Sequence, residues 1–168
     1  MDNYFKKENQ DNAKIKKDFR LLDKSYKINK DENLIPAIIV DLDGTLSLIN
    51  NRTVYDSKEA INDVVNESIL DIINRYKDDH EIIIITGRQV KSHNETHEWL
   101  KKNNIKVDVL YMRDDNDYRE DYIIKLEIYK RFIKNKYSVK FVLEDRNQVV
   151  DMYRQLGLPC FQVYYGDF

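Results

Sequence analysis

The chain has 168 residues, which is enough for one domain with a buried core and too few for two domains of ordinary size. Its 28 Lys and Arg residues nearly balance its 30 Asp and Glu residues, and the net charge of −2 excludes a strong overall attraction to polyanions. Any site for nucleic acid must therefore be local.

The sequence contains a single cysteine, Cys160, and no apolar run long enough to cross a membrane. One cysteine cannot form an intramolecular disulfide, and its apolar surroundings in "PCFQV" suit a small buried side chain. The first residues, "MDNYFKKENQ", do not have the apolar segment of a signal peptide. These features predict a cytoplasmic protein.

Residues 1–36 form a charged amino-terminal arm with nine Lys or Arg and seven Asp or Glu residues. Within it, Ile15, Phe19, Leu22 and Tyr26 recur at helical spacing, which predicts one amphipathic helix that docks on the domain or on a partner. A solvated arm without fixed structure is the alternative. We expect the folded domain to occupy residues 37–168.

From residue 37 onward, apolar runs alternate with helical patterns. The predicted strands cover residues 37–41, 81–86, 107–112, 139–144 and 160–164. The predicted helices lie near residues 57–77, 90–103, 120–136 and 147–156, the last ending at Gly157. Unbroken Ile and Val runs indicate strands covered on both faces, and the spacers are long enough for right-handed crossovers. The pattern predicts a doubly wound α/β fold, a mostly parallel sheet with helices on both faces.

Ligands of such sheets bind at the carboxyl ends of the strands. Polar residues follow three of the predicted strands, and a lysine lies on a predicted helix: Asp41 and Asp43, Thr86 and Arg88, Glu144 and Asp145, and Lys125. Four carboxylates in one crevice repel one another unless a cation neutralises them, and Mg²⁺ prefers such oxygen ligands. The sequence has no GxxxxGK[ST] loop, which weighs against a kinase.

The pair in "DLDGT" suits phosphoryl transfer. Asp41 could attack phosphorus and form an aspartyl phosphate, while Asp43 protonates the leaving oxygen and then activates water. Thr86 could donate a hydrogen bond to the phosphoryl group, and Lys125 could neutralise negative charge. Asp121 lies one helical turn before that lysine and could hold it in place.

These motifs, "DLDGT", the threonine of "ITGR", the helix lysine and the acidic pair of "LEDR", resemble the four motifs of the haloacid dehalogenase (HAD) superfamily of phosphohydrolases. That resemblance implies a HAD-like Rossmannoid fold, here with short insertions and no large cap. Longer stretches, "DLDGTLSLINNRTVYD", "MRDDNDYREDYIIKLEIYKRFI", "EDRNQVVDMYRQLGL" and "YYGDF", resemble the 3′-phosphatase domain of phage-type polynucleotide kinase/phosphatase. The likeness runs from about residue 37 to residue 168.

The narrower resemblance implies removal of 3′-phosphates, and of 2′,3′-cyclic phosphates in some members, from RNA or DNA ends with Mg²⁺. It implies that Asp41 is the nucleophile and Asp43 the acid/base. The implied metal ligands are Asp41, Asp145 and the carbonyl of Asp43, with Glu144 beside them. Glu144 departs from the family, which commonly has aspartate there, so metal geometry is expected to differ. Three further positions that the family needs, which we assign to substrate binding, are Arg52, Arg88 and Asp121.

Two other functions fit parts of the sequence. A phosphatase for nucleotides or other small phosphomonoesters is favoured by the weak net charge and the absence of a basic run. A partner-binding protein that keeps the fold but not the activity would dock through the amino-terminal arm. At single positions, Lys125 and Asp121 could form an ordinary solvated ion pair, and Tyr164 and Tyr165 could be half-buried packing residues or could stack on nucleobases.

Overall fold

The computed structural model describes residues 33–48 and 58–166. The predicted helix of the amino-terminal arm and Arg52 lie outside the described residues. None of the helices in the described part of the chain combines the length and the apolar character that a membrane span requires.

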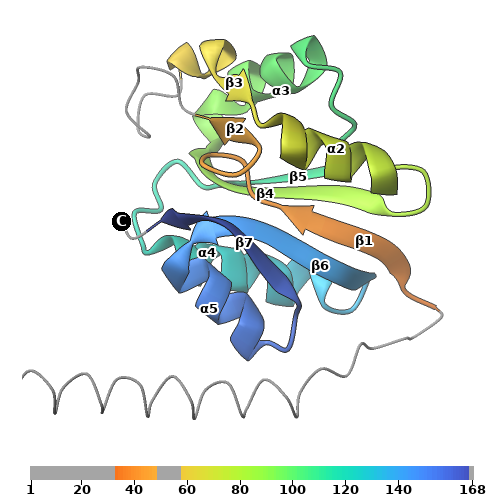
Figure 1. Ribbon diagram of the computed structural model, residues 1–168. Helices are drawn as coiled ribbons and strands as arrows, with labels where there is room; N and C mark the ends of the chain where they lie inside the picture. Colours follow the sequence, from red (N-terminus) through yellow and green to blue (C-terminus); the bar gives the residue numbers. More distant parts are fainter. Residues whose placement is uncertain (1–32, 49–57, 167–168) are drawn as a thin grey trace, which may run out of the picture.

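A five-stranded parallel sheet forms the centre of the domain (Figure 1). Its strands follow the order β5 (Val109–Arg113), β4 (Glu81–Gln89), β1 (Ile35–Val40), β6 (Tyr137–Arg146) and β7 (Cys160–Gly166). Each neighbouring pair is parallel, and β1 lies in the middle between β4 and β6. All five strands fall where the apolar runs predicted them, so the predicted doubly wound α/β fold is confirmed.

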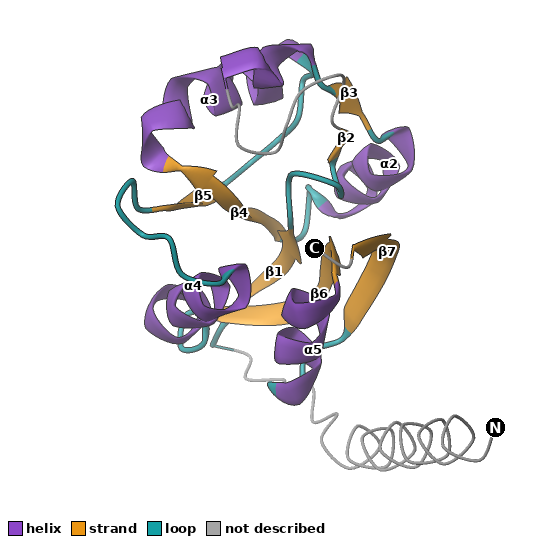
Figure 2. Cartoon of the chain, turned by 90° about the vertical axis from the view of Figure 1, so that its left-hand side faces the viewer, coloured by secondary structure: helices purple, strands orange, loops and turns teal. Residues whose placement is uncertain are grey.

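Helices cover both faces of this sheet (Figures 1 and 2). One face packs against α4 (Asp121–Ile128), its π-helical continuation Tyr129–Ile133, and α5 (Asn147–Gln155). The other face packs against α2 (Glu67–Tyr76) and α3 (His93–Lys102), which follows the short 3₁₀ turn Val90–Ser92. Looking along the strands from their carboxyl ends, Figure 2 shows the two helical layers on opposite sides of the sheet.

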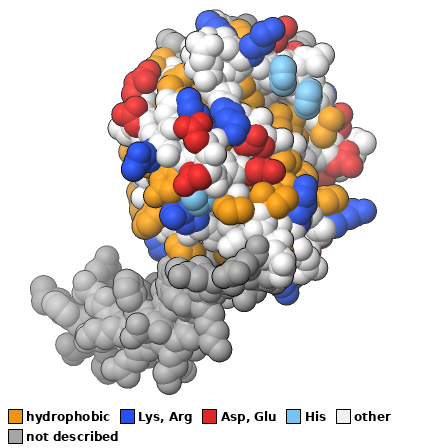
Figure 3. All heavy atoms as spheres, turned by 90° about the vertical axis from the view of Figure 1, so that its right-hand side faces the viewer, with side chains coloured by type: hydrophobic (Ala, Val, Ile, Leu, Met, Phe, Trp, Pro, Cys, Tyr) orange, Lys and Arg blue, Asp and Glu red, His pale blue; other side chains and the backbone are white. Residues whose placement is uncertain are grey.

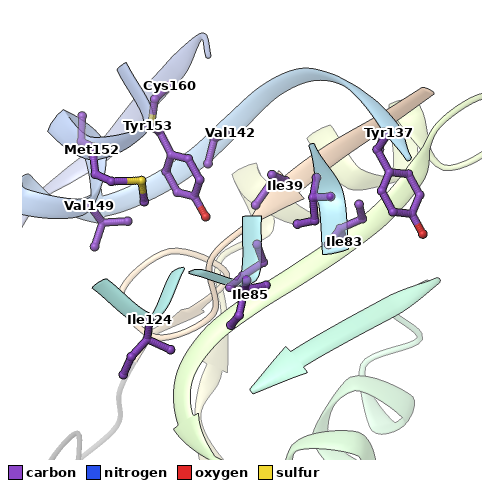
Figure 4. Packing of buried hydrophobic residues seen from close by; sticks show 14 residues of the cluster. Ile39, Ile83, Ile85, Ile124, Tyr137, Val142, Val149, Met152, Tyr153 and Cys160 are labelled. Atoms are coloured by element: carbon purple, nitrogen blue, oxygen red, sulfur yellow. The ribbon is translucent and has the colours of Figure 1, made fainter. Parts of the chain in front are cut away.

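The apolar runs are continuous because alternate residues of a strand enter different cores. In β1, Ile39 joins the core under α4 and α5, whereas Ile38 and Val40 join the core under α2 and α3. Ile83 of β4 lies beside Ile39 in the first of these cores (Figure 4). Burial on both faces rigidly holds the ends of β1, β4 and β6, from which the predicted site residues project.

The prediction of one helix over residues 57–77 is wrong in its first part. A 3₁₀ helix, Lys58–Asn62, comes first, followed by β3 (Val64–Val65), which pairs antiparallel with β2 (Ser47–Leu48), and only then by α2. The β-branched pair in β3 favours an extended chain. Asn66 then stops the strand, because its amide donates to the carbonyl oxygen of Thr45 at 3.0 Å. The result is a small hairpin over the carboxyl edge of the sheet.

On the face opposite to the carboxyl ends, acidic, basic and apolar side chains are intermixed (Figure 3). This distribution agrees with the near balance of charges in the sequence. The predicted site residues lie instead at the carboxyl edge of the sheet.

Candidate active site

The turn after β1 brings Asp41 and Asp43 to the carboxyl edge of the sheet. Gly44 has a φ of +88°, a conformation that residues with a side chain rarely adopt. A Cβ at this position would also overlap the carboxylate of Asp145. The glycine of "DLDGT" therefore lets the backbone after β1 pass directly against the acidic end of β6.

Lys125 of α4 is the centre of a buried group that we call the lysine cluster: Lys125, Asp41, Asp121 and Glu144. The Lys125 Nζ lies 2.6 Å from Asp41 Oδ1 and 2.8 Å from Glu144 Oε2. It also lies 3.2 Å from Asp121 Oδ2, one helical turn earlier. The lysine side chain is only 2% exposed, which rules out the solvated ion pair that was the alternative. Its three N–H groups thus face three carboxylates, from the turn after β1, from β6 and from α4.

The charges in this region do not balance. Burial first, and then the neighbouring Glu144 carboxylate, raise the pKa of Asp41 to about 8 against the opposing effect of Lys125. Burial also raises the pKa of Glu144 to about 7 and that of Asp145 to about 6. Burial alone would lower the pKa of Lys125, but the surrounding carboxylates, Asp121 first, hold it well above its usual range. Arg113 and Arg146 also contact Asp121, so among the described residues Lys125 is left to face Asp41, Glu144 and Asp145. One ammonium group cannot neutralise three carboxylates, so the site favours a further cation.

The donor set fits a hard divalent ion. Asp41, Glu144 and Asp145 each offer a carboxylate oxygen, and these atoms lie within 4.8 Å of one another. Asp41 Oδ2 is buried and has no hydrogen-bond partner among the described residues, which leaves it available as a ligand. Glu144 is more occupied, because Oε2 accepts from Lys125 and Oε1 accepts the backbone N–H groups of Asp145 and Arg146. Asp41 and Asp145 are therefore the better direct ligands, and Glu144 supports them.

Arg88 is the centre of a second group, the arginine cluster: Arg88, Asp43, Asp63 and Ser47. The Arg88 guanidinium donates from Nε to Asp43 Oδ2 and from Nη2 to Asp43 Oδ1, both at 2.7 Å. Nη2 also lies 3.2 Å from Asp63 Oδ2, which accepts the Ser47 hydroxyl at 2.8 Å. Arg88 was predicted to bind substrate, but its side chain is 1% exposed and faces the proposed proton donor.

Thr86 lies three residues before the end of β4, where the pairing with β5 becomes irregular, and it is buried as predicted. Its Oγ1 accepts the backbone N–H of Arg88 at 3.1 Å. Because that contact uses a lone pair, the hydroxyl proton remains available for an acceptor such as a phosphoryl oxygen.

Arg113, the last residue of β5, is a site residue that the sequence analysis missed. Its Nη2 donates to Asp121 Oδ1 at 3.0 Å, its Nε to the carbonyl of Gly87 at 3.0 Å, and its Nη1 to the carbonyl of Arg119 at 2.7 Å. A Cβ at Gly87 would approach Asp121 Oδ1 to 2.8 Å. Arg113 therefore fixes Asp121, and with it the lysine cluster, to the end of β4.

Tyr164 and Tyr165 are each 71% exposed, so half-buried packing is the wrong interpretation for both. They belong to β7 at its carboxyl end. Gln162 of the same strand donates to the carbonyl of Asp145 at 2.9 Å, which ties this end of β7 to the acidic site.

Comparisons with known proteins identify the family of the chain. The family described as "Polynucleotide kinase PNKP phosphatase domain" matches residues 35–168. A protein of Autographa californica nuclear polyhedrosis virus, described as "Putative bifunctional polynucleotide kinase/RNA ligase", is 34% identical over 158 residues, which are 86% of this chain and 22% of the viral protein. A chain of the Pnkp1/Rnl/Hen1 RNA repair complex is 46% identical, with a TM-score of 0.80 over 83% of this chain and 46% of that chain.

A more distant structure shares the fold alone. D,D-heptose 1.7-bisphosphate phosphatase from B. bronchiseptica, complexed with magnesium and phosphate, is 17% identical and has a TM-score of 0.52. It aligns over 76% of this chain and 80% of its own. By contrast, this chain spans less than half of the viral protein and of the repair-complex chain.

Proposed function

Since the chain belongs to the family of PNKP phosphatase domains, with a HAD fold, we propose that it is a Mg²⁺-dependent polynucleotide 3′-phosphatase. The observation that carries the proposal is the buried Asp41, which has one oxygen on Lys125 and the other without a partner among the described residues. Asp43 lies two residues further along the same turn. This pairing supplies a nucleophile and a separate proton carrier.

In the proposed reaction, a carboxylate oxygen of Asp41 attacks the phosphorus of the terminal 3′-phosphate. The bond from phosphorus to the sugar oxygen breaks, and Asp43 gives that oxygen its proton. Asp43 then takes a proton from water, which attacks the aspartyl phosphate, releases inorganic phosphate and restores Asp41. Lys125 offsets the charge that develops on Asp41, and the Thr86 hydroxyl donates to a phosphoryl oxygen.

Asp41 and Asp145, supported by Glu144, are the residues that would hold Mg²⁺. Bound there, Mg²⁺ would supply the positive charge that lets phosphate and carboxylates share the site. A role for the Asp43 carbonyl as a further ligand, and for Arg52 and Asp121 in binding substrate, stays part of the proposal. Asp121 acts indirectly in this scheme, because its carboxylate contacts Lys125, Arg113 and Arg146.

RNA ends are the proposed substrate class. The viral relative is described as a polynucleotide kinase/RNA ligase, and the solved relative belongs to an RNA repair complex. The exposed rings of Tyr164 and Tyr165 beside the site would suit stacking on unpaired bases near the 3′ end. We propose that the chain removes phosphate from damaged ends so that other repair proteins can use them.

The test is a panel of phosphate esters with and without Mg²⁺. It contains 3′-phosphorylated RNA and DNA oligomers, a 2′,3′-cyclic phosphate end, 3′-mononucleotides and p-nitrophenyl phosphate. We expect phosphate release from the 3′-phosphorylated oligomers, dependent on Mg²⁺ and lost in Asp41→Asn. A higher kcat/KM on mononucleotides would instead favour the small-molecule phosphatase, and no hydrolysis across the panel would favour the partner-binding protein.

A further inference from the structure

We propose that Asp63 and Arg88 are positioning residues for Asp43, with Asp63 acting through Arg88 and neither side chain binding the substrate phosphate. The inference rests on the proposed function, in which Asp43 carries a proton. It assigns a role to Asp63, which no motif in the sequence pointed to, and it changes the role predicted for Arg88.

The contact between Arg88 and Asp43 fixes the direction of the carboxylate. Nε and Nη2 of Arg88 donate to the two different oxygens of Asp43, each at 2.7 Å. A planar guanidinium that makes two parallel hydrogen bonds fixes the plane of its partner as well as its distance. The remaining nitrogen, Nη1, donates to Thr96 Oγ1 at 3.3 Å. Every nitrogen of the guanidinium thus has an acceptor within the protein, and the side chain is 1% exposed, so the group is directed at Asp43 rather than at a substrate phosphate.

Asp63 fixes Arg88 from the other side. Its carboxylate is 0% exposed and lies 3.2 Å from Arg88 Nη2. The same Oδ2 accepts the hydroxyl of Ser47 on β2 at 2.8 Å, and the backbone carbonyl of Asp63 accepts the indole N–H of Trp99 on α3 at 2.9 Å. Asp63 is therefore immobilised by the hairpin and by α3, two parts of the chain that do not belong to the lysine cluster.

The position of Nη2 connects the two carboxylates. It lies 2.7 Å from Asp43 Oδ1 and 3.2 Å from Asp63 Oδ2. The guanidinium consequently keeps a buried acceptor when Asp43 Oδ1 turns toward a leaving oxygen. Without the Asp63 carboxylate, Asp43 would be the remaining charge partner of Arg88 within the described part of the chain, and the direction of both side chains would be less well defined.

The test compares Asp63→Asn with the wild-type protein on two substrates of different leaving-group quality. A sugar 3′-oxygen leaves poorly without a proton, whereas p-nitrophenolate leaves readily, so misplacing the proton donor should affect only the first reaction strongly. We expect kcat/KM to fall by about 10- to 100-fold on a 3′-phosphorylated oligomer. On p-nitrophenyl phosphate we expect a change of less than about threefold, because kcat/KM reports the step in which the leaving group departs.

Two variants calibrate this result. Asp43→Asn should show the same selectivity with a larger loss on the oligomer. Val150→Ala removes apolar contacts from the core under α4 and α5, whereas Arg88 contacts Thr96 of α3 on the other face of the sheet, and any loss the variant causes should be equal on both substrates. Should Asp63→Asn fold poorly, Ser47→Ala removes one hydrogen bond to Asp63 and a 3.4 Å contact to Arg88 Nη2, and it is expected to give a weaker loss of the same kind.

A readout that does not need activity completes the test. The Arg88 Nε–H is buried against Asp43, and we expect NMR to show slow hydrogen exchange at this group, at least about tenfold faster in Asp63→Asn. Equal losses on both substrates, a change confined to KM for the oligomer, or unchanged exchange at Nε would overturn the proposal. If wild-type protein hydrolyses p-nitrophenyl phosphate but not the oligomer, the proposed substrate fails, and the exchange measurement still decides the role of Asp63.

Discussion

Asp41 and Asp43 are two residues apart, and each lies against a buried cation, but the two cations hold their carboxylates differently. Lys125 is a compact charge with three donors, and it directs them to three separate carboxylates from three elements. The guanidinium of Arg88 is planar, and two of its nitrogens donate to the same carboxylate, that of Asp43. As a result, Asp41 keeps a buried oxygen without a partner among the described residues, whereas both oxygens of Asp43 are held.

Two aspartates in the turn after β1 can therefore have different roles, because different cations hold them. The lysine cluster belongs to the sheet and α4, carries an excess of negative charge and favours a metal ion and a phosphate. The arginine cluster connects Asp43 to β4 and to the hairpin, and it fixes the orientation of the Asp43 carboxylate rather than adding charge to the site. Four predictions test this division, from the largest expected effect to the smallest.

Replacing each aspartate by asparagine should give different kinds of loss. Asp41→Asn should lower kcat/KM by more than about 10⁴-fold on every substrate, because the attacking atom is gone. Asp43→Asn should lower it strongly on 3′-phosphorylated oligomers and much less on p-nitrophenyl phosphate. The measurement is steady-state kinetics on both substrates. Asp41→Asn should still fold, since it removes a charge that burial disfavours, and residual turnover above background in this variant would contradict covalent catalysis by Asp41.

Removing the lysine should destabilise the fold. Lys125→Met leaves three buried carboxylates without their shared partner and should cost about 3–5 kcal/mol of unfolding free energy at pH 8. The cost should be smaller at pH 6, because protonation can neutralise Asp41 and Glu144 there. Urea unfolding at the two pH values measures the difference. Lys77→Met, which removes a lysine that bonds Asn74 at the surface, is the control and should change stability very little.

The metal-free protein should become less stable as the pH rises from 6 to 8. The folded-state pKa values of Asp41, Glu144 and Asp145 are raised to about 8, 7 and 6. The folded protein therefore has its full stability below about pH 4, where these groups are protonated in both states, and it loses stability as the pH rises through the folded-state values. We expect a loss of about 1–3 kcal/mol in EDTA. Mg²⁺ should largely restore it at pH 8, as measured by unfolding with and without the ion. A stability that rises with pH in EDTA would contradict this assignment.

Shortening Glu144 should have the mildest effect. Glu144→Asp restores the aspartate common in the family, but one methylene less cannot keep both the contact to Lys125 and those to the backbone N–H groups of Asp145 and Arg146. We expect Mg²⁺ affinity to fall by about tenfold, measured as the Mg²⁺ dependence of activity. Glu144→Gln keeps the length and tests the charge, and a larger loss from the aspartate than from glutamine would show that length matters more.

The sequence could predict the lysine cluster because buried parallel strands have a clear sequence pattern, a continuous run of apolar residues. Unbroken apolar runs located the ends of β1, β4 and β6, and the parallel fold places those ends at one edge. Asp41, Thr86 and Glu144 could therefore be named with little more than this rule. Lys125 could be named as a candidate, but its spacing alone did not separate it from a surface residue, since a lysine four residues after an aspartate is ordinary on any helix.

The arginine cluster could not be predicted in the same way. Its hairpin consists of two strands of two residues each, which is too short for a periodic pattern. Asp63 fell inside a span predicted as helix, where a charged residue indicates a solvated face. Arg113 could have been found, because it directly follows the predicted strand over residues 107–112, and the same rule that gave Thr86 applies to it.

The order of the strands has a consequence for how the protein is made. Asp41 and Lys125 are 84 residues apart, and β1 pairs with β4 and β6 rather than with a strand close to it in the chain. During synthesis, the nucleophile therefore emerges from the ribosome long before its lysine and before the strand that carries Glu144 and Asp145. A nascent chain that stops short of β6 contains Asp41 and Lys125 but lacks Glu144 and Asp145, so premature products should be inactive as well as unfolded.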